Sequence, residues 1–270
     1  MLKHRVLVAA LLGPLFLWII YLGRMPLAVL VLLLCSLMWH EFQKITLPTM
    51  TLPERLLTFI LGLVICGRSL GLIPNLYPNL FLAGLILLLF ILLLKNPLPL
   101  ENSITKLSLM FLGLFYCFAL LPYLSNLREE PHGLGLVLLA LLTTWSGDTA
   151  AYFCGRAWGK AKLYPTISPG KTRAGAYGAI VGALASSFAV IALFEIPISI
   201  GHTIALGILI AISGILGDLA ESMLKRAYGV KDSSNILPGH GGILDRFDAF
   251  LFVIPITYCY CTIVLDLSGG

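Results

Sequence analysis

Residues 79–98 read NLFLAGLILLLFILLLKNPL and carry a single charged side chain, Lys95. A run of about 18 or more apolar residues is long enough to cross the hydrocarbon core of a membrane as a helix. Similar runs recur along the whole chain of 270 residues, which is 59% hydrophobic and 11% charged. Because a typical soluble domain has about 25% charged residues, the composition predicts a multi-spanning integral membrane protein.

The apolar runs predict an all-α fold with about nine transmembrane helices. We place these helices at residues 5–23, 26–42, 54–74, 79–98, 105–125, 133–154, 174–195, 201–224 and 244–265. The first run lacks a small-residue cleavage site, so we expect it to be retained and not removed as a signal peptide. Residues 1–132 are expected to be N-terminal scaffold helices, and residues 133–270 a catalytic region of the same membrane domain.

Positive charge predicts the orientation of these spans. With the N-terminus in the cytoplasm, all but three of the 18 Lys and Arg residues fall on the cytoplasmic side; the exceptions are Arg24, Arg68 and Arg128. Cytoplasmic loops of membrane proteins are enriched in Lys and Arg. We therefore expect a multi-pass protein of the cell inner (cytoplasmic) membrane, with its N-terminus in the cytoplasm and a polar active site facing the cytoplasm.

The two halves of the chain differ in their polar residues. In the first half, His40 and Glu41 end the second predicted span, and we interpret both as residues of the membrane interface. The second half carries carboxylates at or near membrane depth. An ionisable group there is costly and is by default a candidate for function.

Residues 217–226, GDLAESMLKR, are expected to form the inner end of the eighth span. At about 100° per residue, Asp218, Ser222 and Lys225 share one face of a helix. A salt bridge that closes the helix end would explain Lys225 and Arg226. It explains Asp218 less well, because a carboxylate so close to the hydrocarbon needs a stronger reason.

A glycine-rich loop follows and leads into the last predicted span. Gly241 and Gly242 would let a ligand approach the backbone, whose N–H groups can cradle phosphate oxygens. Asp245 and Asp248 lie three residues apart in the first turn of that span. With Asp218 they form a set of oxygen ligands, which suits Mg²⁺ and not zinc. A helix cap would explain Asp245 alone.

The run from Ser222 to Asp248, SxLKRx4KDxSx2LPxHGGIxDRFD, resembles the signature of the phosphatidate cytidylyltransferases (CDP-diacylglycerol synthases). Two earlier runs, DTAAY at residues 148–152 and SPGKT at residues 168–172, are similar to further runs of that family. The family usually has a Glu-Gly pair just after the second run, where this chain has Ala174 and Gly175. This departure removes any role for a carboxylate at position 174.

The resemblance implies an enzyme of phospholipid biosynthesis, a CTP:phosphatidate cytidylyltransferase and hence a nucleotidyltransferase. It would transfer CMP from CTP to phosphatidate by Mg²⁺-dependent in-line attack at the α-phosphorus, giving CDP-diacylglycerol and pyrophosphate. CTP, phosphatidate and membrane lipid are then the expected partners, with no nucleic acid. The resemblance also suggests a homodimer and a second cation such as K⁺.

The expected site residues fall into three groups. The metal ligands are expected to be Asp218, Asp245 and Asp248. The catalytic residues, which neutralise phosphates or donate hydrogen bonds, are expected to be Ser222, Lys225, Arg226, Lys231, Asp232, His240 and Arg246. The substrate-binding residues are expected to be Asp148, Lys160, Ser168, Lys171, Thr172, Gly241 and Gly242. Arg156 and Lys162 are interpreted as ordinary cytoplasmic cations.

Three other interpretations of these residues are less well supported. A secondary transporter also carries polar residues at membrane depth, but here they cluster at one side and no matching half-repeat appears. A CTP-dependent lipid kinase would release CDP instead of pyrophosphate. Gly170-Lys171-Thr172 resembles the end of a nucleotide P-loop, but that motif needs a glycine where this chain has Pro165, and we expect no strand before it.

Overall fold

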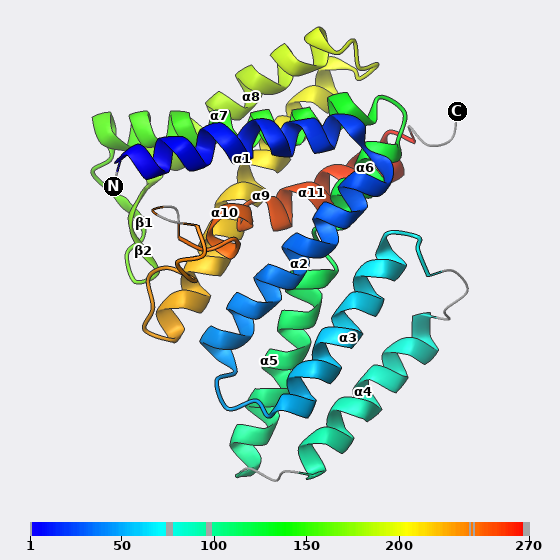
Figure 1. Ribbon diagram of the computed structural model, residues 1–270. Coiled ribbons are helices and arrows are strands. Elements are labelled where there is room, and N and C mark those ends of the chain that lie inside the picture. Colours follow the sequence, from blue (N-terminus) through cyan, green and yellow to red (C-terminus); the bar gives the residue numbers. More distant parts are fainter. Residues whose placement is uncertain (1, 74–77, 96–98, 238, 240, 267–270) are drawn as a thin grey trace.

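The computed structural model describes residues 2–73, 78–95, 99–237, 239 and 241–266. It is almost entirely helical (Figure 1). The elements, in chain order, are α1 (Leu2–Leu22), α2 (Arg24–Thr46), α3 (Leu52–Ser69), α4 (Pro78–Lys95), α5 (Leu100–Phe118), α6 (Tyr123–Glu129), α7 (Gly133–Trp158), β1 (Lys162–Tyr164), β2 (Ser168–Thr172), α8 (Arg173–Leu193), α9 (Ile200–Ala227), α10 (Leu244–Phe247) and α11 (Phe250–Cys259). The last helix continues as a π-helix over Tyr260–Val264.

The predicted all-α membrane architecture is confirmed. Five helical stretches are long and apolar enough to cross a membrane, namely Arg24–Thr46, Glu101–Glu129, Gly133–Trp158, Arg173–Leu193 and Ile200–Ala227. Shorter apolar helices cover Ala10–Leu22, Ala83–Leu94 and Phe250–Val264 in the described part of the chain. Each predicted span overlaps helix in the described residues, although the span at 105–125 reaches from α5 into α6 and the span at 244–265 covers α10, α11 and the π-helix. The number of helices that cross the membrane stays a prediction.

The helices form two packed groups (Figure 1). In the first, α5 packs against α2, α3 and α4; in the second, α7, α8, α9 and α11 pack against one another. Trp39 and Phe42 near the end of α2 are fully buried and stack on each other. They pack against α5, where Gly113 leaves room for both rings. This aromatic contact fixes the last turns of α2.

Small residues bring α7 and α8 into close contact. A side chain at Gly178 would collide with the Ala150 carbonyl, and one at Gly182 would collide with Ala150 and Ser146. Membrane helices use small residues at such contacts because close backbone packing, and not a hydrophobic force, drives their association. The contact holds the end of α7, which carries Asp148, against α8.

A second close approach joins α9 to the start of α11. A Cβ at Gly217 would lie 2.5 Å from the Asp248 carbonyl oxygen and 3.0 Å from Ala249 Cα. The glycine therefore lets the two backbones touch at this point. As a result, Asp218, the next residue of α9, lies beside the chain segment that carries Asp248.

An antiparallel hairpin, β1–β2, connects α7 to α8 and was not predicted. Lys162 pairs with Thr172, and Tyr164 pairs with Ser168. The prediction that no strand precedes Gly170-Lys171-Thr172 was therefore wrong, since β1 precedes these residues and they lie in β2. The two strands are only three and five residues long, which is too short for a clear alternation of apolar and polar residues.

Candidate active site

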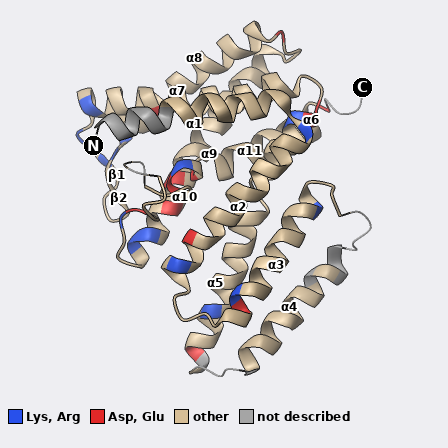
Figure 2. Ribbon diagram, viewed as in Figure 1, with Lys and Arg blue, Asp and Glu red and all other residues tan. Residues whose placement is uncertain are grey.

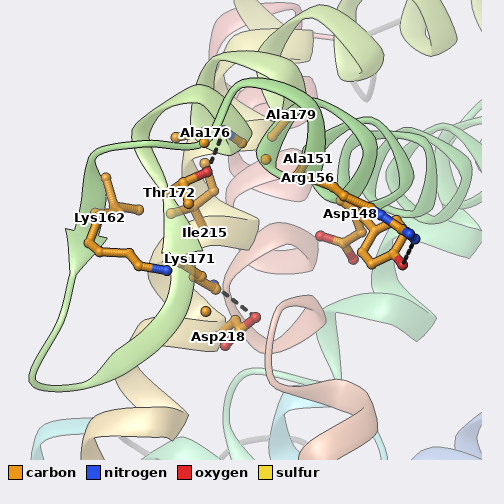
Figure 3. Close-up of a pocket in the computed structure, with 16 residues that line it drawn as sticks. Asp148, Ala151, Arg156, Lys162, Lys171, Thr172, Ala176, Ala179, Ile215 and Asp218 are labelled. Atoms are coloured by element: carbon orange, nitrogen blue, oxygen red, sulfur yellow. Dashed lines mark hydrogen bonds and ion pairs between the residues drawn. The ribbon is translucent and has the colours of Figure 1, made fainter.

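A pocket of about 530 Å³ lies between the hairpin and the helices α7, α8 and α9 (Figure 3). This volume is within the range of about 300–1,000 Å³ that is usual for small-ligand sites. The pocket brings together residues from separate parts of the sequence: Asp148, Lys171, Thr172 and Asp218 all line it. Arg156 and Lys162, which we interpreted as ordinary cytoplasmic cations, line it as well.

The charged groups of the pocket centre on one ion pair. Lys171 Nζ lies 2.8 Å from Asp218 Oδ2, and Ser222 Oγ donates a 3.2 Å hydrogen bond to Asp218 Oδ1. The charges of Asp148 and Asp248 both act on Asp218 and on Lys171. Of these three carboxylates only Asp218 contacts Lys171 directly, and Arg156 and Lys162 add two further cations to the pocket lining.

The expected metal ligands divide between two places. Asp218 lines the pocket and lies beside the chain segment that carries Asp248, whereas Asp245 is engaged in a separate network described below. Within the described residues, no three His, Cys, Asp or Glu side chains already stand in position to hold a metal ion. The donor chemistry, which is carboxylate oxygen only, still suits Mg²⁺.

The second network is built around Lys225 of α9. Its Nζ atom lies 2.5 Å from Glu221 Oε2 and 2.6 Å from Asp245 Oδ1. The Lys225 side chain is 11% exposed, and Glu221 is buried. Lys225 therefore neutralises two carboxylates of the protein itself, unlike the neighbouring cations Arg226, Lys231 and Arg246, which are exposed.

Asp245 also holds the loop that precedes it. Its Oδ2 atom accepts hydrogen bonds from the Ser233 backbone at 2.9 Å, the Ser233 hydroxyl at 3.0 Å and the Gly242 backbone at 2.8 Å. Gly241 has φ +80°, a conformation that favours glycine. The backbone N–H of Gly242 is therefore bonded within the protein and does not point to a free anion site.

Glu41 holds the same loop from the other side, and our interpretation of it as an interface residue was wrong. Its side chain is 0% exposed. It accepts hydrogen bonds from the hydroxyls of Ser233 and Ser234 and from the backbone N–H groups of Ile243 and Leu244. His40, by contrast, is exposed.

The remaining expected site residues lie around these two networks. Thr172 is buried and caps α8 by accepting a 3.1 Å hydrogen bond from the Gly175 backbone. Lys160 and Asp232 are exposed, and Ser168 is half-buried in β2. His240 lies outside the described residues.

Gly242→Ala is expected to disrupt this loop. A Cβ at position 242 would lie within 3.0 Å of Ser233 Oγ and of both carboxylate oxygens of Glu41. Because those groups are fixed by hydrogen bonds, the substitution should cost about 1–3 kcal/mol of unfolding free energy, as other overpacked sites do. Thermal unfolding in detergent measures this loss. Gly201→Ala, where an added Cβ meets nothing within 4 Å, is the matched control, and an equal melting temperature for both variants would contradict the expectation.

Comparison with known proteins identifies the family of the chain. The chain matches the cytidylyltransferase family over residues 3–264. It is 37% identical to the phosphatidate cytidylyltransferase of Bacillus subtilis over 265 residues, which cover 95% of this chain and 96% of the relative. It is 34% identical to the phosphatidate cytidylyltransferase of Staphylococcus haemolyticus over 255 residues, which cover 94% and 96% of the two chains. The resemblance noted in the sequence is thereby confirmed, and the chain belongs to the cytidylyltransferase family.

Proposed function

We propose that this chain is a CTP:phosphatidate cytidylyltransferase that forms CDP-diacylglycerol and pyrophosphate. The observation that carries the proposal is the pocket, where cations of the hairpin meet carboxylates of α7 and α9 at the ends of membrane helices. A soluble nucleotide and the phosphate of a membrane lipid can meet at that depth. Membership of the cytidylyltransferase family and the names of the relatives support the same reaction.

This reaction requires the protein to position the two substrates and to neutralise the charge of their phosphates. The phosphate monoester of phosphatidate is itself the nucleophile, so no strong general base is needed. Its oxygen forms a bond to the α-phosphorus of CTP while the bond to the β-phosphate oxygen breaks, and pyrophosphate leaves. Arg156, Lys162 and Lys171 line the pocket and would offset the phosphate charges. Ser222 would hold Asp218 in place through its hydrogen bond.

Magnesium is part of this proposal. Asp218 and Asp248 would hold it, and Asp245 would join them only if its Oδ1 atom, which lies 2.6 Å from Lys225 Nζ, left that contact. Asp245 Oδ2 already accepts three hydrogen bonds. When bound, Mg²⁺ would neutralise phosphate charge that builds up during the displacement. A second cation such as K⁺ is proposed on the family resemblance alone.

We also propose that the pocket faces the cytoplasm and that the N-terminus lies on the same side. In Figure 1, α1 begins on the side of the hairpin and the last helix ends on the opposite side of the molecule, which fits an odd number of crossings. Lys and Arg residues gather around the hairpin and at the ends of α2, α7 and α9 (Figure 2). This asymmetry agrees with the enrichment of positive charge in cytoplasmic loops. A homodimer is proposed on the family resemblance alone.

Product analysis tests the reaction directly. Purified protein with Mg²⁺, phosphatidate and CTP labelled at the α-phosphate should yield a labelled CDP-lipid and unlabelled pyrophosphate. Lipid labelled only from γ-labelled CTP, with release of CDP, would instead identify a lipid kinase. Uptake of a solute into proteoliposomes with no turnover of CTP would support the transporter hypothesis.

A further inference from the structure

Glu41 of α2 connects the N-terminal helices to the loop that the active site depends on. We infer that Glu41 is a positioning residue for the transfer reaction, which it serves by fixing the two ends of the loop, Ser233–Ser234 and Ile243–Leu244, against α2. This inference rests on the proposed function. It assigns a role in the reaction to a residue in the half of the chain that we interpreted as scaffold.

Four donors lie within hydrogen-bond distance of the two oxygens of Glu41, and one of them, the single proton of Ser233 Oγ, is shared with Asp245. Oε1 accepts from Ser234 Oγ at 2.5 Å and from Ile243 N at 2.9 Å. Oε2 accepts from Ser233 Oγ at 3.1 Å and from Leu244 N at 2.7 Å. Among the described residues, no Lys, Arg or His forms an ion pair with this carboxylate. A buried charge is costly unless it is compensated. These donors therefore stabilise the Glu41 carboxylate, and the carboxylate in turn fixes the loop residues that carry the donors.

The carboxylate is fixed at its other end by the packing of α2. Trp39 and Phe42 flank it in the sequence, and both are fully buried against α5. The loop is therefore tied to a rigid part of the helix and not to another loop. A site supported by a regular element is held more precisely than one supported by a flexible segment.

The bonded segment leads directly to the acidic residues of the site. Ile243 and Leu244 immediately precede Asp245, and Asp248 follows one helical turn later. Ser233 Oγ lies within hydrogen-bond distance of both Glu41 and Asp245, so the two carboxylates clamp the loop between them. A shift of the loop would move Asp245, Arg246 and Asp248 together. A misplacement of about 1 Å at a catalytic site can cost about 10²-fold in rate.

Glu41→Gln tests the inference because it keeps the shape of the side chain and removes two acceptor sites. If the amide nitrogen faces Ser233, that hydroxyl can accept from it and donate to Asp245. The backbone N–H of Leu244 can only donate, however, so it loses its hydrogen-bond partner when the amide nitrogen replaces Oε2. We expect kcat/KM for CTP to fall by about 10²-fold, with the KM for CTP or for phosphatidate raised at least about fivefold by misplaced phosphate-binding cations such as Arg246.

Two further readouts separate positioning from a loss of folded protein. Unfolded enzyme lowers the apparent kcat and leaves KM unchanged, so a change in KM reports a displaced site. Hydrogen exchange followed by mass spectrometry should show faster exchange in residues 233–244 of Glu41→Gln, whether or not the protein is active. Ser234→Ala removes one donor and should have a smaller effect of the same kind.

Glu54→Gln is the matched control. Glu54 is as buried as Glu41, but it pairs with Lys106, away from the loop. We expect this variant to lose stability while both KM values and the exchange of residues 233–244 stay as in the wild type. The inference is overturned if Glu41→Gln leaves both KM values within twofold of the wild type, or if it leaves the exchange of the loop unchanged. A wild-type protein that makes no CDP-lipid would instead overturn the proposed function. The exchange experiment would still test whether Glu41 fixes the loop, because it does not depend on activity.

Discussion

Asp218→Asn is expected to lower kcat/KM for CTP by about 10³-fold or more while the protein stays folded. Loss of a single preorganised electrostatic contact at a reacting centre commonly costs about 10²–10³-fold. Asp218 makes more than one such contribution: it pairs with Lys171, accepts from Ser222 and is a proposed ligand of Mg²⁺. Asparagine keeps the size of the side chain and removes its charge, so a large effect would report electrostatics and not packing.

Initial rates over a range of Mg²⁺ concentrations provide the measurement. If Asp218 holds the metal, the variant should need more Mg²⁺ for half-maximal activity as well as turning over slowly. Glu195→Gln is a suitable control because Glu195 is exposed in the connection between α8 and α9. A rate for Asp218→Asn within about fivefold of the wild type would exclude the assigned role, since each tenfold change corresponds to about 1.4 kcal/mol of transition-state stabilisation.

The helices and the pocket residues Asp148, Lys171 and Asp218 could be predicted from the sequence. Apolar runs long enough to span a membrane leave little choice of secondary structure. Carboxylates at membrane depth are costly, so the chain could be expected to gather them at one place. The structure does bring Asp148, Lys171 and Asp218 to one pocket.

The role of Glu41 was missed although the sequence contains a signal for it. Glu41 lies seven residues after Leu34 and fourteen after Leu27, and all three are buried. Seven residues are close to two helical turns, so Glu41 falls on the face of α2 that packs inward. The helical period therefore indicated a buried carboxylate, but its partners lie about 190 to 200 residues later in the chain, and no local pattern identifies them.

The carboxylates that pair with Lys225 could not be predicted from the sequence either. Helical spacing places Lys225 four residues after Glu221 and close to the face of Asp218. Either carboxylate could have been its partner from spacing alone. The choice depends on Asp245, which the loop brings to the far side of Lys225, and on Lys171, which the hairpin brings to Asp218. Both are tertiary contacts, so the expected role of Lys225 in binding phosphate has to be tested separately.

Lys225→Met is therefore expected to lower the free energy of unfolding by about 3–5 kcal/mol, the usual cost of removing one partner from a buried ion pair. The substitution leaves the buried carboxylates of Glu221 and Asp245 without their shared cation. Methionine fills a similar volume, so the loss would report charge and not a cavity. The double variant Glu221→Gln, Lys225→Met removes one of the stranded charges and should recover part of the stability.

Lys231→Met provides the contrast for this measurement. Lys231 is exposed, and surface substitutions usually change stability by less than about 0.5 kcal/mol. If Lys231 contacts phosphate, as the sequence predicts, its variant should lose activity at nearly unchanged stability, whereas the Lys225 variant should lose both. Denaturant unfolding in detergent, read beside the KM for CTP, distinguishes the two lysines. The expectation would be contradicted if Lys225→Met were as stable as the wild type and only its KM for CTP were raised. Lys225 would then bind substrate instead of stabilising the carboxylates of Glu221 and Asp245.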